Sequence, residues 1–349
     1  MSKDEVEKAP CLGVENKHGA RLLQLNFTCY YCLNMKLGAT FSHRHLQYLG
    51  LDVKQSAEQY VKLGFNWVRL GCYWDEIEKE KGKFDFSRIE ELLQFFEKNK
   101  VKVLLTVGMK APRWPEYYLP EWIKKEFNLK YLGTIKPDHK LITDNLYPYL
   151  EKTVNHLKKF TCINSWQVEN EPLNPFGEKR WRISPEILQK EIAVIRKNDK
   201  REITLNFGAG VASMPFFWNK IKDLDFDNLG LNIYFKVATI KGVFKYFPYV
   251  RNYSQVMVSG LINKSRNSGK KIYLTELQSE PWEPDELVAH SDNPPSFMPE
   301  DFKKNLEKIN SWDIDVVFLW GYEYWLWRKL IKGDNSYWQE AKNVIPFLT

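Results

Sequence analysis

The sequence predicts an α/β fold in which eight short strands alternate with helices and close into a single (β/α)8 barrel. Three observations predict this fold. Short apolar or β-branched runs recur along the chain, amphipathic stretches separate them, and several loops that follow the runs are long. An open doubly wound sheet is the structural rival, but no Gly-x-Gly-x-x-Gly motif follows the first strand.

The strands are expected at eight runs, taken in chain order. They are Leu37–Phe41, Trp67–Leu70, Val101–Val107, Ser165–Val168, Ile203–Phe207, Leu229–Tyr234, Lys271–Thr275 and Val316–Trp320. Between them, apolar residues three and four positions apart predict helices, as around Ile89 and around Ile192. Residues 35–349 are therefore expected to form one catalytic barrel, since such barrels routinely run past about 200 residues as one domain. Residues 1–34 show no clear periodicity and are predicted to be an N-terminal leader or cap, partly disordered.

Charge and aromatic content narrow the class of partner. The net charge is +7, but basic and acidic residues are interleaved in helical stretches such as residues 88–100. Such mixing indicates solvated helix faces, so no nucleic-acid partner is expected. The 13 Trp and 18 Tyr residues are more informative. Aromatic rings offer flat apolar surfaces on which sugars stack, which favours a carbohydrate partner.

The cysteines and the first residues of the chain indicate the cellular compartment of the protein. Five widely spaced cysteines, an odd number, indicate reduced thiols and an intracellular protein. Cys29 and Cys32 form a C-x-x-C pair, but no second pair or His cluster follows, so neither a metal nor a cofactor is expected. The first residues lack the apolar region of a signal peptide, and no run is long enough to span a membrane. A cytoplasmic protein without membrane contact is predicted, with a removed anchor or secretion signal as the alternative.

Two glutamates are candidates for chemistry because each ends a predicted strand. Glu171 follows the fourth strand and Glu276 follows the seventh. A carboxylate that closes an apolar strand is costly to bury without a function or a partner, so two structural ion pairs are the alternative. In a closed barrel, the carboxyl ends of the strands face one central site. Hydrolysis of a glycosidic bond needs such a pair, one carboxyl protonated and the other ionised.

These residues lie in segments that resemble clan A of the glycoside hydrolases, which includes cellulases, β-mannanases and β-galactosidases. Asn170-Glu171-Pro172 looks like the acid/base motif of the clan, and Glu276 looks like its nucleophile. The resemblance covers roughly residues 36–330. Residues 108–116 and 276–282 are most similar to a microbial, cellulase-like group within the clan.

Further segments extend the resemblance and imply roles. Residues 63–70 resemble the second strand of clan members, which implies that Arg69 keeps the nucleophile ionised. Tyr234 looks like the tyrosine that hydrogen-bonds the nucleophile. The loop with Trp74 and the segment from Trp320 to Trp325 look like substrate-binding or supporting elements, the latter an aromatic floor beneath the sugar being cleaved. A structural ion pair for Arg69 and core positions for Tyr234 and Trp320 are the alternatives.

Long loops contribute the remaining candidates. Trp114 and Trp282 lie in loops where core burial is less natural, so stacking on sugar is predicted. Glu169 and Glu280 do not match the clan motifs and are candidates to bind sugar hydroxyls. His43 and His45 follow the first strand and either contact substrate or have no role.

The sequence thus predicts a retaining β-glycoside hydrolase that acts by double displacement, with Glu171 as acid/base and Glu276 as nucleophile. Retention requires the two carboxyl groups to be about 5 to 5.5 Å apart, and inversion about 6.5 to 9.5 Å. A non-catalytic carbohydrate-binding barrel is the first alternative. A metal-dependent hydrolase is the second, although the six histidines do not supply ligands at the strand ends.

Overall fold

A closed ring of parallel strands forms the centre of the computed structural model, which describes residues 36–208, 214–236, 250–283 and 292–345. The barrel strands are β1 (Lys36–Phe41), β2 (Trp67–Gly71), β3 (Lys102–Val107), β5 (Ile163–Val168), β7 (Glu202–Gly208), β8 (Asn228–Ile233), β9 (Lys271–Gln278) and β10 (Val316–Trp320). They pair in the order β1-β10-β9-β8-β7-β5-β3-β2, and β1 also pairs with β2, which closes the ring. The predicted (β/α)8 barrel is therefore confirmed, with a strand at each of the eight predicted runs. The predicted leader at residues 1–34 lies outside the described residues.

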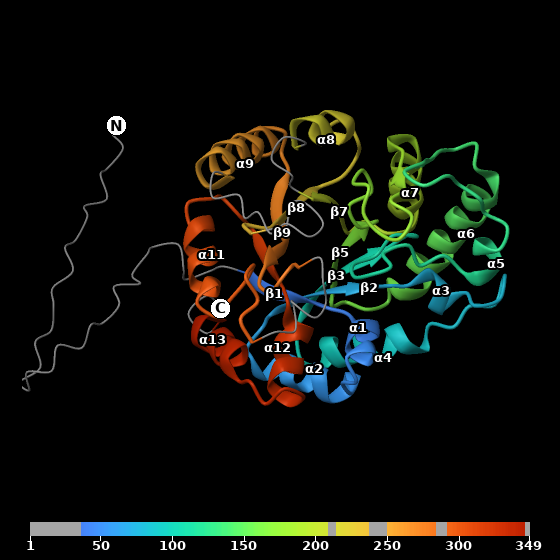
Figure 1. Ribbon diagram of the computed structural model, residues 1–349. Helices are drawn as coiled ribbons and strands as arrows, with labels where there is room; N and C mark the ends of the chain where they lie inside the picture. Colours follow the sequence, from blue (N-terminus) through green and yellow to red (C-terminus); the bar gives the residue numbers. More distant parts are fainter. Residues whose placement is uncertain (1–35, 209–213, 237–249, 284–291, 346–349) are drawn as a thin grey trace, which may run out of the picture. The chain divides into compact units, whose positions relative to one another are not determined.

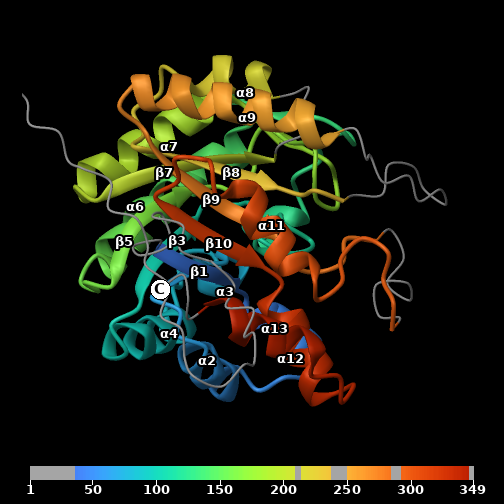
Figure 2. The same cartoon turned by 90° about the vertical axis from the view of Figure 1, so that its left-hand side faces the viewer.

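Helices lie outside the ring of strands, as Figures 1 and 2 show. They are α1 (His43–Tyr48), α2 (Val53–Lys62), α3 (Trp74–Ile77), α4 (Ser87–Lys98), α5 (Glu121–Lys124), α6 (Lys140–Leu157), α7 (Pro185–Asn198), α8 (Met214–Ile221), α9 (Val250–Asn267), α11 (Asp301–Ile309), α12 (Tyr322–Leu330) and α13 (Ser336–Val344). None of the described helices is long and apolar enough to cross a membrane.

Local sequence explains why these helices form and pack where they do. Asp52 caps α2, because its side chain accepts a hydrogen bond from the backbone N–H of Gln55 at 2.7 Å. Pro185 occupies the first turn of α7, where the missing N–H is not needed. Ile187 and Ile192 of α7 are buried, so the predicted apolar stripe faces the barrel. Each such side chain stabilises the fold by about 1.5 to 3 kcal/mol relative to exposure.

A second, small sheet lies among the long loops. It pairs β4 (Thr134–Ile135) with β6 (Arg182–Ile183), in the connections that follow β3 and β5. These connections include two of the predicted long loops, and the backbone N–H of Ser184 also bonds to the carbonyl of Ile135 at 3.0 Å. The pairing therefore ties the two loops to each other beside the carboxyl ends of the strands.

The barrel interior is apolar at one level and polar at the next. Trp67, Leu104, Tyr273, Val316 and Phe318 form one buried apolar cluster from four strands. Successive side chains of a strand point to opposite faces, so the residues between them join the core under the helices. Toward the carboxyl ends, the inward side chains become polar, which places the candidate site on a packed base.

Strand β9 contains an irregularity at its functional end. It runs to Gln278, three residues beyond the predicted end at Thr275. Its partners along β8 jump from Leu231↔Leu274 to Asn232↔Glu276, so Thr275 is the extra residue of a β-bulge. Thr275 hydrogen-bonds Asn232 inside the barrel, and Glu276 hydrogen-bonds Arg69 there too. The bulge thus turns two consecutive side chains to the same side.

Candidate active site

Arg69 of β2 lies at the centre of a polar network under the barrel mouth. Its guanidinium donates to Gln167 Oε1 at 2.8 Å, to Asn170 Oδ1 at 2.6 Å and to Glu276 Oε1 at 2.8 Å. Arg69 is completely buried, and such a charge is stable only when it is paired and hydrogen-bonded. The three acceptors fix the guanidinium, and the guanidinium in turn fixes Glu276.

Glu276 receives donors on both carboxylate oxygens. Arg69 bonds Oε1, and the hydroxyl of Tyr234, the residue after β8, donates to Oε2 at 2.6 Å. Hydrogen bonds to a charged acceptor are among the stronger ones in proteins, and both of these stabilise the ionised form. Burial of Tyr234 raises the pKa of its hydroxyl, and the charge of Glu276 raises it further, so the hydroxyl keeps its proton as a donor.

Glu171 lies across the network, just beyond β5. Its Oε1 accepts a hydrogen bond from Asn232 Nδ2 at 2.7 Å, and its backbone N–H donates to Asn206 Oδ1 at 2.8 Å. The backbone of Glu171 has φ of 46°, in the left-handed region that non-glycine residues rarely adopt. Burial raises the pKa of Glu171 to about 8, and the charges of Glu276 and Glu116 contribute to the rise. At neutral pH, the carboxyl group therefore holds a proton.

Glycines make room for the acidic side chains that follow β5. A Cβ atom at Gly208, the last residue of β7, would lie 2.4 Å from Oε1 of Glu171. A Cβ atom at Gly108, just after β3, would lie 2.4 Å from Cδ of Glu169. Both distances are far below van der Waals contact, so the carboxyl groups occupy space that only glycine leaves free.

Glu169 is part of the scaffold and does not reach the mouth. It is completely buried, and its oxygens accept hydrogen bonds from the backbone N–H groups of Met109 and Lys110. Burial raises its pKa to about 7. Burial and the nearby charge of Glu169 also raise the pKa of Glu191, in α7. The expectation that Glu169 binds sugar hydroxyls is therefore wrong.

Residues 108–118, which follow β3, form a hairpin that we call the cross-mouth hairpin. Backbone hydrogen bonds from Ala111 to Glu116 at 2.9 Å and from Tyr118 to Met109 at 2.8 Å hold its two arms together. Sequence reasoning noted a resemblance for this segment but assigned a role only to Trp114. Two of its charged residues, Lys110 and Glu116, lie beside Glu171.

Lys110 connects this hairpin to the backbone around Glu171. Its completely buried ammonium group donates to the carbonyl oxygens of Glu171 at 3.0 Å and Asn174 at 3.2 Å. It also lies 3.1 Å from Oε2 of Glu116. Burial raises the pKa of Glu116, although Lys110 opposes that shift. Lys110 thus stabilises the strained backbone at Glu171, and Glu116 provides its charge partner.

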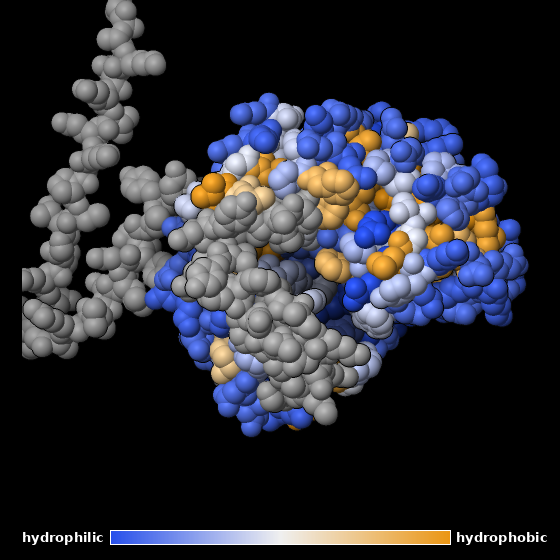
Figure 3. Space-filling view, turned by 45° about the horizontal axis from the view of Figure 1, so that its top comes forward, coloured by the Kyte–Doolittle hydropathy of each residue, from blue (hydrophilic) through white to orange (hydrophobic). Residues whose placement is uncertain are grey.

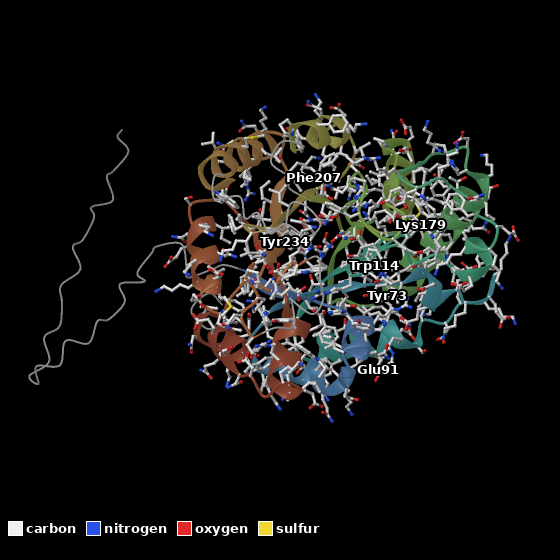
Figure 4. All side chains as sticks on the ribbon, viewed as in Figure 1. Tyr73, Glu91, Trp114, Lys179, Phe207 and Tyr234 are labelled. Carbon is white, nitrogen blue, oxygen red and sulfur yellow. The ribbon has the colours of Figure 1, made fainter. Side chains whose placement is uncertain are left out.

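The predicted aromatic residues divide into exposed and enclosed groups. Trp114 is 72% exposed and Trp282 is 46% exposed, so both rings are accessible to a ligand. Figure 4 labels Trp114, in the hairpin after β3, and Tyr234, after β8, which come from different sides of the ring. In Figure 3, the described surface is hollowed near the centre of the view, with hydrophobic side chains on part of the rim.

Trp74 and Trp325 are enclosed by protein, which corrects one expectation. Both are completely buried. Trp74 stacks on Tyr149 and donates to Glu78, and Trp325 donates to the carbonyl of Ser279 at 2.6 Å. Sugar stacking by these two rings is excluded by their burial, and each supports a loop instead.

Trp320, the last residue of β10, is almost completely buried, and the side chain of Arg113 covers its ring. The guanidinium carbon lies 4.0 Å from the centre of the Trp320 ring. Arg113 also bonds Glu280, beyond β9, and Glu323 of α12. Glu280 is therefore an ion-pair partner of Arg113, and its expected contact with sugar hydroxyls stays a prediction.

His43 is buried, and its Nε2 lies 2.7 Å from Oε2 of Glu76, so it stabilises the loop after β1. The ring of His45 stacks on that of Tyr48. Among the residues that the structure describes, no three His, Cys, Asp or Glu side chains gather as a metal site would require. Cys72 and Cys162 are free and buried, and the other three cysteines lie outside the described residues.

Part of the sequence matches the model of a known protein family. The family model for glycoside hydrolase family 42, described as β-galactosidase, matches residues 47–184. This segment includes Arg69 and Glu171 and ends before Glu276. A search of curated proteins finds no match.

Solved structures share the fold. Xylanase 10B from Thermotoga maritima is 17% identical with a TM-score of 0.58, covering 90% of this chain and 96% of that one. A β-galactosidase from Halorubrum lacusprofundi is 13% identical with a TM-score of 0.58, covering 82% of this chain and 52% of that one. An exo-β-1,4-mannosidase from Opitutaceae bacterium strain TAV5 is 14% identical with a TM-score of 0.59, covering 89% and 60%. With the family match, this likeness confirms the resemblance to clan A glycoside hydrolases.

Proposed function

We propose that this chain, a glycoside hydrolase of clan A by its family match and fold, hydrolyses β-linked sugars with retention of configuration. The observation that supports the proposal best is the contrast between two buried carboxyl groups in one network. Glu276 accepts hydrogen bonds from Arg69 and Tyr234, whereas the pKa of Glu171 is raised by burial and then by Glu276 to about 8. The carboxylate of Glu276 is held by two donors, and the carboxyl group of Glu171 keeps a proton at neutral pH, which is the arrangement that double displacement uses.

In the first step, Glu276 attacks the anomeric carbon of the sugar, and Glu171 gives its proton to the leaving oxygen. The bond from the anomeric carbon to that oxygen breaks, and a covalent glycosyl ester forms on Glu276. Attack is aided because Arg69 and Tyr234 hold the carboxylate in one orientation.

In the second step, water replaces the leaving group. Ester formation removes the negative charge of Glu276, which is one cause of the raised pKa of Glu171. The pKa of Glu171 therefore falls, and its carboxylate can take a proton from water as the water attacks the anomeric carbon. The sugar leaves with its original configuration, and both glutamates return to their starting states.

Product stereochemistry tests this proposal. Aryl β-glycosides of several sugars, together with β-glucan and β-mannan oligosaccharides, would be incubated with the full chain, and the first anomer released would be read by proton NMR. We expect the β-anomer before mutarotation. Initial release of the α-anomer would exclude double displacement. Tight binding of sugars without turnover of any substrate would favour the non-catalytic carbohydrate-binding alternative.

A further inference from the structure

The cross-mouth hairpin connects opposite sides of the barrel mouth. In the ring order, β3 and β9 are separated by the same number of strands in both directions, so they face each other across the barrel. The hairpin follows β3, yet Arg113 at its turn bonds Glu280 beyond β9 and Glu323 of α12. Its base stays on the near side, where Lys110 bonds the carbonyl of Glu171 at 3.0 Å.

Arg113 is fixed at the far side by several contacts. One guanidinium nitrogen lies 2.5 Å from Oε2 of Glu323, and another bonds Glu280. Oε1 of Glu323 is itself held by the backbone N–H of Ser42 at 2.6 Å. Burial alone would lower the pKa of Arg113, but the two carboxyl groups raise it, so the guanidinium stays charged. Removing a buried charge from such partners is costly, so the contact is not expected to open readily.

The proposed chemistry sets the direction in which a substrate lies. Glu171 protonates the leaving oxygen, so the leaving group lies on the β5 side of the mouth. A sugar attached at O4 of the cleaved unit, across the ring from the anomeric carbon, extends in the opposite direction. In the ring order, the strand opposite β5 is β10, which ends at Trp320.

Arg113 occupies this opposite side. Its guanidinium covers the ring of Trp320 at 4.0 Å, and Arg113, Glu280, Glu323 and Trp320 are all nearly or completely buried. A second sugar there would have to displace a charged side chain from two carboxyl groups and an aromatic ring.

The leaving-group side is different, because it presents an accessible aromatic surface. Phe176 is 43% exposed, and its ring lies 3.2 Å from where a Cβ of Gly208 would be, beside Oε1 of Glu171. A sugar or an apolar group can stack there next to the acid.

We infer that the site accepts a single sugar on its non-reducing side, so that the enzyme removes terminal sugars from chain ends and does not cleave within chains. This inference rests on the proposed function and specifies its substrate class. The relevant substrates are β-linked oligosaccharides or glycoconjugates with a free non-reducing end. The solved structures that share the fold include both xylanases and an exo-mannosidase, so the fold by itself does not decide the mode of attack.

Blocked substrates test the inference on the unmodified protein. Aryl β-disaccharides of glucose and of mannose would be compared with the same compounds carrying a 4,6-O-ethylidene group on the non-reducing sugar. We expect the free compounds to release a monosaccharide and an aryl monoglycoside. The blocked compounds should give no product above the level of a Glu276→Gln control. Release of the aryl group from blocked compounds at a rate comparable with the free ones would overturn the inference and leave the proposed function intact.

If neither free nor blocked compounds nor simple aryl glycosides are hydrolysed, the proposed function fails and the inference fails with it. A double variant, Arg113→Ala with Glu280→Gln, uncovers Trp320 and avoids leaving Glu280 as an unpaired carboxylate. We expect its rate on blocked compounds, relative to free ones, to rise above that of the unmodified protein. The matched control is Arg88→Ala with Glu91→Gln, an exposed pair on α4, which should keep the unmodified ratio. An unchanged ratio in a folded Arg113 variant would count against the inference.

Discussion

The β9 side and the β5 side of the barrel mouth bury the same chemical group in different surroundings. Glu276 is 4% exposed and Glu171 is 6% exposed, so solvent access hardly separates them. Glu276 faces the guanidinium of Arg69 and the hydroxyl of Tyr234. Glu171 faces an amide of Asn232 and the charges of Glu276 and Glu116. Because the two glutamates are buried to a similar depth, their different neighbouring donors and charges are what distinguishes one from the other.

The largest effect is expected on the β9 side. Glu276→Gln removes the proposed nucleophile, and kcat/KM for every substrate should fall by about 10⁴-fold or more. Initial rates with aryl glycosides check this, with Glu178→Gln as a control because Glu178 is exposed. Full activity in the Glu276 variant would remove the assignment.

On the β5 side, the loss of kcat/KM caused by a substitution of Glu171 should depend on the leaving group of the substrate. Glu171→Gln should lower kcat/KM by about 10² to 10⁴-fold for substrates with poor leaving groups, because general acid catalysis is lost. Activated aryl glycosides need little protonation and should be affected less. Added azide should restore turnover and give a β-glycosyl azide, which chromatography can identify. Equal losses for all leaving groups with no effect of azide would contradict the assignment.

A smaller loss is expected when one donor to Glu276 is removed. Tyr234→Phe deletes a hydrogen bond to a charged group, which contributes about 1.5 to 3 kcal/mol. If this bond stabilises the reacting carboxylate, kcat/KM should fall by about 10 to 100-fold. Azide should not rescue this variant, because its acid is intact. Tyr131→Phe, at an exposed tyrosine, is the control, and equal behaviour of the two variants would refute the role.

The pH profile should show the raised pKa of Glu171. The protonated form persists through neutral pH and is lost as pH rises through about 8. Above that pH, kcat/KM should therefore fall by about tenfold per pH unit, whereas below it this group imposes no loss. This fall in kcat/KM at alkaline pH should be absent when the Glu171→Gln variant acts on an activated aryl glycoside. Its persistence in that variant would assign the ionisation to another group.

Sequence alone predicted the strands because barrel strands are buried on both faces and read as apolar runs. The predicted strand at β9 ended at Thr275, before the observed end at Gln278, because Glu276 and Gln278 are polar and interrupt the apolar run. Polar residues at the carboxyl end of a barrel strand line the site and still belong to the strand. A β-bulge leaves no signature in apolar periodicity, so the turn of Thr275 and Glu276 to one side could not be foreseen.

The partners of Arg113 were missed for a different reason. Glu280 is 167 residues away in sequence and Glu323 is 210 residues away, and no local pattern links such distant charges. Trp74 and Trp325 were assigned to the site from motif resemblance, which does not say which face of a loop or helix a ring occupies. Packing against Tyr149 and Ser279 decided that instead.

The two glycines beside β5 have a consequence for judging related chains. Gly108 and Gly208 have no chemistry of their own, yet the space beside each is filled by Glu169 and Glu171 respectively. A chain with alanine at position 208 could retain every reacting residue and still lack an acid in the right place. Loss of activity during divergence can thus begin when a methyl group replaces a glycine hydrogen on a neighbouring strand. A motif search centred on the reacting residues would see nothing changed.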